Sequence, residues 1–115
     1  MIMVVVMIGG ALGSAARYLV GATFPHGTVI VNLVGCFVLG AVVPLAGPQQ
    51  WSPELRAAIA TGFLGGFTTY SSFNQETLTM FANGAHGQAV ANIAITLMGG
   101  LAAGALGFAA ARAFQ

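Results

Sequence analysis

Charged side chains are almost absent from this chain, and their scarcity limits what it can fold into. Three basic and two acidic residues are spread over 115 residues, or 4% of the total, while 57% of the residues are hydrophobic and the mean hydropathy is +0.90. Soluble domains have about a quarter of their residues charged. The chain could not cover a soluble surface, so we predict an all-α integral membrane protein that contacts the lipid bilayer.

Turn-forming residues divide the chain into four apolar stretches. We expect membrane spans at about residues 2–22, 28–45, 54–82 and 88–111. Since a membrane helix needs ~20 residues, little length is left over, and we expect a single membrane domain over residues 1–115. The first stretch has no basic segment before it and is longer than a signal peptide, so we expect it to remain as a span.

The third stretch contains an unusual polar segment at residues 65–73, with the sequence GGFTTYSSF. Paired glycines weaken a helix, and the four Thr and Ser hydroxyls that follow them can bond backbone groups left unpaired. Irregular backbone inside a membrane is tolerated only where protein or a water-filled cavity covers it. We therefore expect the third helix to break in mid-membrane near residues 65–69 and to form an ion or substrate site there.

Three further polar side chains lie inside the predicted spans. Asn32 lies well within the second span, where an amide either bonds a neighbouring helix or lines a polar path. Arg17 lies about a turn from the end of the first span, where it either snorkels to the surface or has a structural or vestibule role. Glu76 follows the predicted break, and an unpaired carboxylate is costly at that depth.

Glycines recur at every fourth position in the first and fourth stretches. Gly9 and Gly13 form one such pair, and Gly100 and Gly104 form another. This spacing lets another helix approach closely. We expect these glycines to serve helix packing rather than transport.

Enzymatic, metal-binding and nucleic-acid-binding functions find little support in the sequence. His26 and His86 lie in predicted turns, without acidic or cysteine partners at ligand spacing, which argues against zinc. Cys36 stands alone inside a span, where we expect a small buried side chain. The net charge is +1 and there is no basic patch, so we expect no nucleic-acid partner. We expect no enzyme activity.

Transport fits the buried polar side chains better. Neutral hydroxyls, amides and the positive edges of aromatic rings can replace part of the hydration shell of a small anion without holding it too tightly. Carbonyls exposed at a helix break could hold a cation. These observations predict a path for a compact anion. The side chains concerned are Asn32, Thr68, Thr69, Tyr70, Ser71, Ser72, Asn74 and Thr77.

The few charges also bear on orientation in the membrane. With four spans, Arg56 and Arg112 lie on one side and Arg17 on the other. The positive-inside preference is therefore nearly balanced. Such a chain could insert in both orientations, and two opposed copies would reproduce the inverted repeats of larger transporters.

Three motifs resemble the Fluc, or CrcB, family of fluoride channels. They cover the first three spans in order, and the third is the most specific. The resemblance implies a channel that passively exports fluoride across the prokaryotic cytoplasmic (inner) membrane and so protects the cell against fluoride toxicity. The motifs are Gly9-Gly10-x-x-Gly13-Ser14-x-x-Arg17-Tyr18, Gly27-Thr28-x-x-Val31-Asn32-x-x-Gly35-x-Phe37-x-x-Gly40, and Gly62-Phe63-x-Gly65-Gly66-Phe67-Thr68-Thr69-Tyr70-Ser71-Ser72-Phe73 followed by Glu76.

The resemblance implies an assembly as well. Members of the family are four-span subunits that form antiparallel, dual-topology dimers with two fluoride pores and one central sodium ion. The sodium would be held by backbone carbonyls near Gly65 and Thr68 of each subunit. The partner is either a second copy of this chain or a homologous chain, and the sequence leaves both open.

Roles for individual residues follow from the same resemblance. Arg17 and Glu76 would lie in the vestibules, and Tyr70 would flank fluoride together with an aromatic partner. Tyr70 stands where phenylalanine is usual, so its hydroxyl either adds a donor or narrows the passage. Asn92 and Thr96 share one face of the fourth span and are candidates on that ground alone. The predicted fluoride pore consists of Asn32, Thr69, Tyr70, Ser71, Ser72 and Phe73.

Two other membrane functions compete with the fluoride channel. A small proton-coupled multidrug or cation exporter has the same size, but it requires a carboxylate deep in an early span, and the first two spans have none. A structural membrane subunit would explain the packing glycines. It would not explain a helix break rich in hydroxyls and aromatic rings.

Overall fold

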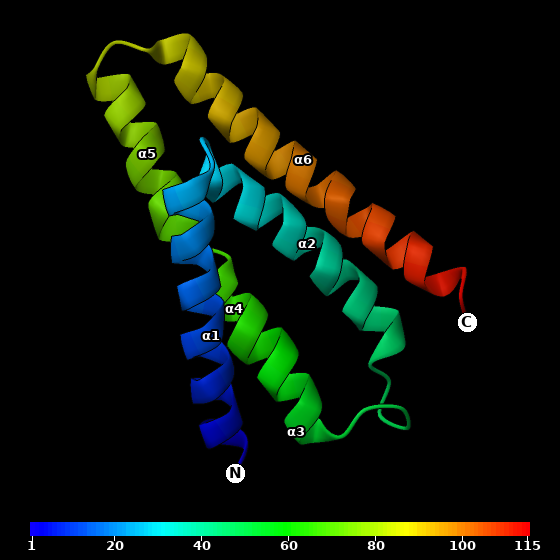
Figure 1. The fold of residues 1–115 in the computed structure, drawn as a ribbon. Coiled ribbons are helices and arrows are strands. Elements are labelled where there is room, and N and C mark those ends of the chain that lie inside the picture. Colours follow the sequence, from blue (N-terminus) through cyan, green and yellow to red (C-terminus); the bar gives the residue numbers. More distant parts are fainter.

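The computed structural model describes residues 1–115 and consists of helices joined by short turns. Three helices are long and apolar enough to cross a membrane: α1 (Ile2–Thr23), α2 (Gly27–Leu45) and α6 (His86–Arg112). The chain is therefore a multi-pass membrane protein. Figure 1 shows α2 beside α6, and α1 beside the helical run that follows α2.

The run between α2 and α6 is divided into four helical elements. It begins where its residue types favour a helix, because Ser52 Oγ accepts a hydrogen bond of 3.1 Å from the Leu55 amide and Pro53 is the first helical residue. The second element is a π-helix, which is rare at this length. The elements are α3 (Pro53–Arg56), η1 (Ala57–Leu64), α4 (Gly65–Phe67) and α5 (Tyr70–Ala82).

A two-residue interruption separates α4 from α5. Thr68 and Thr69 are extended, with φ −91° and ψ 155° at the first and φ −152° and ψ 118° at the second. The interruption lies inside the 65–69 window that the sequence pattern indicated. It divides the helical run into two parts, residues 53–67 and residues 70–82.

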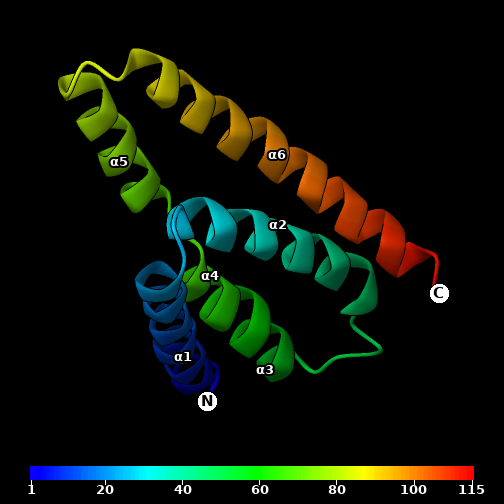
Figure 2. The ribbon, with the colours of Figure 1, turned by 45° about the horizontal axis from the view of Figure 1, so that its top comes forward.

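Glycines bring the helix backbones into direct contact. A Cβ atom added at Gly13 would collide with the Phe63 carbonyl, and one added at Gly40 would collide with the Gly104 carbonyl. The packing role predicted for Gly13 is therefore confirmed, whereas a Cβ atom added at Gly104 would make only an ordinary contact of 3.6 Å with the Cys36 carbonyl. Figure 2 shows α2 lying between α6 and the α3–α4 run.

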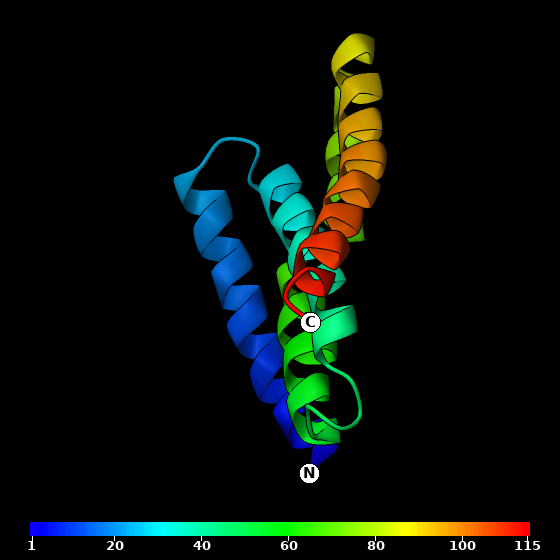
Figure 3. The same ribbon diagram turned by 90° about the vertical axis from the view of Figure 1, so that its right-hand side faces the viewer.

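Little of the protein is buried within a single chain. Only 16 of 115 residues are buried, and the molecule measures 51 × 31 × 20 Å. Figure 3 shows α1 and α6 on opposite sides, diverging toward the end where α1 joins α2. Many large apolar side chains are exposed, and this carries no penalty where lipid or another membrane helix covers them.

Candidate functional site

Asn32 of α2 holds the broken backbone between α4 and α5. Its Nδ2 donates to the Thr69 carbonyl at 3.1 Å, and the Thr69 amide donates to Asn32 Oδ1 at 2.8 Å. Both backbone groups of Thr69 are thereby paired. Of the two roles predicted for this amide, the structure shows the interhelical bond. Since a primary amide has two N–H donors, one remains for a ligand.

Arg17 of α1 binds the end of the first half-helix. Its Nε donates to the Gly66 carbonyl at 2.9 Å. A positive charge is stabilising at the C-terminal end of a helix, where carbonyls lack partners. Arg17 is half-buried and bonded within the protein, so it does more than reach toward the membrane surface. Its other guanidinium N–H groups remain for a second partner.

A cavity of about 390 Å³ lies beside Arg17, between α1, α2 and α5. Its polar lining offers guanidinium and hydroxyl donors and no carboxylate. These are groups that can bind an anion. The lining residues are Arg17, Tyr18, Gly21, Ala22, Gly27, Thr28, Thr69 and Ser72.

Glu76 of α5 is paired rather than isolated. The Thr28 hydroxyl donates to its Oε2 across the space between α2 and α5. Thr28 lies at the start of α2, whose N-terminus has no side-chain cap, and a carboxylate is favourable at that positive helix end. Thr28 also lines the Arg17 cavity, so Glu76 reaches the edge of that cavity through it.

A smaller cavity of about 220 Å³ lies against the break on the α6 side. Tyr70 and Phe73 meet edge to face on it, with ring centroids 5.5 Å apart and planes at 68°. Thr96 Oγ1 is buried there without a hydrogen-bond partner. The cavity therefore combines ring edges with an unused hydroxyl. Its lining residues are Asn32, Cys36, Thr68, Thr69, Tyr70, Phe73 and Thr96.

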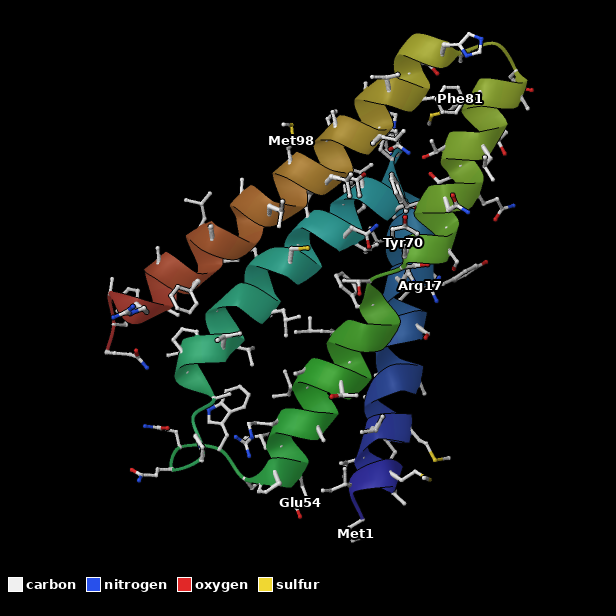
Figure 4. All side chains as sticks on the ribbon, turned by 180° about the vertical axis from the view of Figure 1, so that it is seen from behind. Met1, Arg17, Glu54, Tyr70, Phe81 and Met98 are labelled. Carbon is white, nitrogen blue, oxygen red and sulfur yellow. The ribbon has the colours of Figure 1, made fainter.

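Thr69 lies between the two cavities, because it lines both of them. Its hydroxyl accepts from the Ser72 amide at 3.2 Å and lies 3.3 Å from the Ser71 and Ser72 hydroxyls. Ser72 faces the Arg17 cavity, whereas Ser71 is exposed. Figure 4 shows the labelled Arg17 and Tyr70 close to the break.

Two cavity-lining residues, Thr28 and Cys36, are not among the site residues that the sequence predicts. Thr28 belongs to a family motif with no assigned role, and the sequence predicts only a packing role for Cys36. Both lie on the Asn32 face of α2, because residues 28, 32 and 36 are spaced by four. That spacing was the signal that could have identified them. The structure does not bring every candidate together. Arg17 and Ser72 line only the Arg17 cavity, and Glu76 and Ser71 line neither cavity.

The break also leaves carbonyl oxygens available for a cation. The Thr69 amide would close a helical bond to the Gly65 carbonyl, but it donates to Asn32 instead. The Thr68 carbonyl accepts no hydrogen bond. Unwound carbonyls of this kind coordinate sodium in transporters. The backbone carbonyl oxygens of Gly65 and Thr68 therefore fit the sodium site that the family resemblance implies.

Comparison with known proteins extends the match beyond the motifs. A family model described as CrcB-like protein, Camphor Resistance (CrcB), matches residues 4–108. A protein named Fluoride-specific ion channel FluC from Sorangium cellulosum (strain So ce56) is 46% identical over 114 residues, which cover 91% of this chain and 90% of that protein.

Two more proteins of that name are similar to this chain. The one from Bordetella petrii (strain ATCC BAA-461 / DSM 12804 / CCUG 43448) is 43% identical over 116 residues, covering 96% of this chain and 91% of that protein. The one from Gloeobacter violaceus (strain ATCC 29082 / PCC 7421) is 43% identical over 119 residues, covering 96% and 95%. The similarity spans nearly the whole chain, and the chain belongs to the CrcB, or Fluc, family, as its motifs predicted.

Proposed function

We propose that this chain is a subunit of a passive, fluoride-selective channel. The observation that carries the proposal is the cavity at the helix break. Tyr70, Phe73, Thr96 and Asn32 line one small space there. The Thr96 hydroxyl has no partner, and one N–H of Asn32 is left unbonded. The membrane-spanning helices of the chain and its similarity to proteins named fluoride-specific ion channels support fluoride as the conducted ion.

The two cavities suggest a route. An anion enters the Arg17 cavity, where the guanidinium attracts it, and passes Thr69 to reach the aromatic rings. Neutral donors and ring edges then replace water around the ion one at a time. No fixed positive charge lines the smaller cavity, so the ion is not trapped there. Ser71 and Ser72 extend the hydroxyl track at the start of α5, and Glu76 lies toward the vestibule.

One chain leaves this route incomplete. Tyr70 exposes 74% of its surface although its neighbour Phe73 exposes only 6%. A second copy that covers α5 would close the path on that side. We therefore propose an antiparallel, dual-topology homodimer with two pores, in which the α3–α5 run serves as the third of four spans. The nearly balanced arginines allow both orientations.

In such a dimer, a sodium ion would lie between the two breaks. The Gly65 and Thr68 carbonyls of each copy would hold it, and the bound cation would tie the two copies together. The remaining contacts of the break, Asn32 with Thr69 and Arg17 with Gly66, keep these carbonyls in place within each chain. Replacing sodium with a large organic cation should lower the thermal midpoint of the purified dimer, and an unchanged midpoint would count against this site.

In a bacterium the channel would act in the cytoplasmic membrane and let accumulated fluoride leave the cell, which protects it. Growth tests this directly. A strain that lacks its own fluoride channel should regain growth in fluoride when it expresses this protein. The Phe73→Ile variant, expressed at the same level, should not restore growth because it lacks the ring edge. Failure of the unaltered chain to protect the cells would contradict the proposal.

A further inference from the structure

Two buried hydrogen bonds in series hold α5 against α6. The side chains that form them line neither the Arg17 cavity nor the smaller cavity. Asn92 Nδ2 donates to Thr77 Oγ1 at 2.9 Å, and Thr77 Oγ1 donates to the Phe73 carbonyl at 2.8 Å. Asn92 exposes only 8% of its surface and Thr77 only 6%. The bonds link α6 to the backbone of the residue whose ring lines the smaller cavity.

The direction of these bonds assigns a definite part to Asn92. A hydroxyl has one proton to donate and two lone pairs to accept with. Because the Thr77 proton goes to the Phe73 carbonyl, Thr77 can only accept from its other partner. Position 92 therefore supplies the donor of the interhelical bond, and an apolar or purely accepting side chain there would lose this bond between α6 and α5.

Only one other side-chain hydrogen bond joins α5 to a neighbouring helix, and it runs from the Thr28 hydroxyl of α2 to Glu76. α5 follows two extended residues, so its rotation is not fixed by the helix before it. It packs on α6 more than on any other element, and Phe73 and Thr77 are its two buried residues. With side chains a helix is about 10–12 Å wide, so a rotation of 20° moves a ring roughly 2 Å.

We infer that Asn92 is a positioning residue: through Thr77 it sets the rotation of α5 and so aims the Phe73 ring edge at the conducted ion. The inference rests on the proposed fluoride channel. It concerns a residue that lines a different cavity, of about 450 Å³, together with His26 and Gln88, rather than the cavity at the break. Asn92 thus acts on the ion through Phe73 and has no contact with the smaller cavity.

Fluoride efflux per dimer from liposomes tests the inference. Asn92→Leu and Thr77→Val each remove one hydrogen-bonding side chain of this link and replace it with an apolar side chain of nearly the same size. Each should slow efflux about tenfold, the kinetic equivalent of one lost buried hydrogen bond. Thr77→Ser keeps the hydroxyl and should conduct at close to the wild-type rate. The double variant should be no slower than either single variant, because both break the same link.

A purely structural role is distinguished by combining these changes with Phe73→Ile. If Asn92 acts through the ring, adding Asn92→Leu should change the slower, residual efflux of Phe73→Ile by less than about twofold. A full tenfold loss in that background, or wild-type efflux in both Asn92→Leu and Thr77→Val, would overturn the inference. Gel filtration establishes that each variant is a dimer.

A second readout does not depend on conduction. Fluorine NMR of protein carrying 4-fluorophenylalanine at position 73 reports the surroundings of that ring directly. The signal should shift in Asn92→Leu and Thr77→Val and stay in place in Thr77→Ser. An unshifted signal in the first two variants would refute the positioning role. Absence of fluoride efflux from the wild-type protein would instead refute the proposed channel, so the two failures are separable.

Discussion

At the scale of single residues, Asn32 combines two tasks. Its carbonyl and one N–H pair the Thr69 backbone, and its second N–H is free at the smaller cavity. A buried backbone group left unpaired costs about 1–3 kcal/mol. Asn32 thus supports the break and also offers a donor where an anion would pass. Both tasks need the amide, since a carboxylate has no N–H.

Asn32→Asp should reduce fluoride efflux by at least about 100-fold, since it places a negative charge on the anion path and removes the donor to the Thr69 carbonyl. Efflux from liposomes, normalised to the amount of dimer, is the measurement. Gln49→Glu adds the same charge in an exposed loop and is the matched control. Wild-type efflux from Asn32→Asp would contradict the location of the path.

Tyr70→Phe should keep fluoride efflux within about threefold of wild type, because the edge-to-face contact with Phe73 survives. The Tyr70 hydroxyl has no hydrogen-bond partner within the chain. The same efflux assay measures the effect. Complete loss of efflux would mean that the hydroxyl itself binds the ion or is required to seal the dimer.

At the scale of elements, the break depends on how closely α1 approaches the π-helical η1. Gly9 and Gly13 contact the η1 backbone directly, and this approach brings Arg17 within reach of the Gly66 carbonyl. The wide π-helical turn and the glycines of α1 therefore act together. Side chains at the contact would separate α1 from the run and withdraw Arg17 from its carbonyl.

Gly13→Ala should destabilise the folded protein by about 1–3 kcal/mol, since its methyl group would collide with the Phe63 carbonyl. Gly21→Ala on the same helix is the control, because a methyl group there meets no atom within 4 Å. Thermal denaturation in detergent compares the two. Equal midpoints for both variants would show that the close contact of α1 with η1 is not needed.

The sequence predicted the helix break better than the contacts that hold it. The glycine pair and the hydroxyls around Thr68 and Thr69 are local signals, and they placed the interruption within five residues. The partners of Asn32 and Arg17 lie 37 and 49 residues away. Local periodicity does not reveal which helices become neighbours. The sequence therefore does not distinguish an Asn32 amide that binds the broken backbone from one that only lines a pore. The π-helix also lacked a local signal.

At the scale of the whole molecule, a single chain is too thin to enclose a path. Few of its residues are buried, and the Tyr70 ring is exposed beside the break. Lipid can cover the apolar surfaces, but it cannot pair the hydroxyls at the start of α5. A second copy in the opposite orientation would supply the missing wall, and the same arrangement would bring the carbonyls of two breaks together.

Dual topology predicts that a cysteine placed in the α5–α6 turn faces both sides of the membrane. In a Cys36→Ser background, Asn83→Cys should react with an impermeant thiol reagent in about half of the molecules of intact cells, because Asn83 is exposed in the turn and the arginine bias is nearly balanced. Permeabilised cells give the total. Labelling of nearly all or almost none of the molecules would show a single orientation and would exclude the antiparallel homodimer.

The central claim is that copies of this chain, with no other protein, form a passive path for fluoride. Its most direct test is ion efflux from liposomes that contain only the purified protein, followed with a fluoride electrode, with chloride efflux as the control. Rapid fluoride efflux that needs no proton gradient, with negligible chloride efflux, is the expected result. A folded dimer that releases no fluoride would contradict the claim and would point to a homologous partner chain or to a proton-coupled substrate.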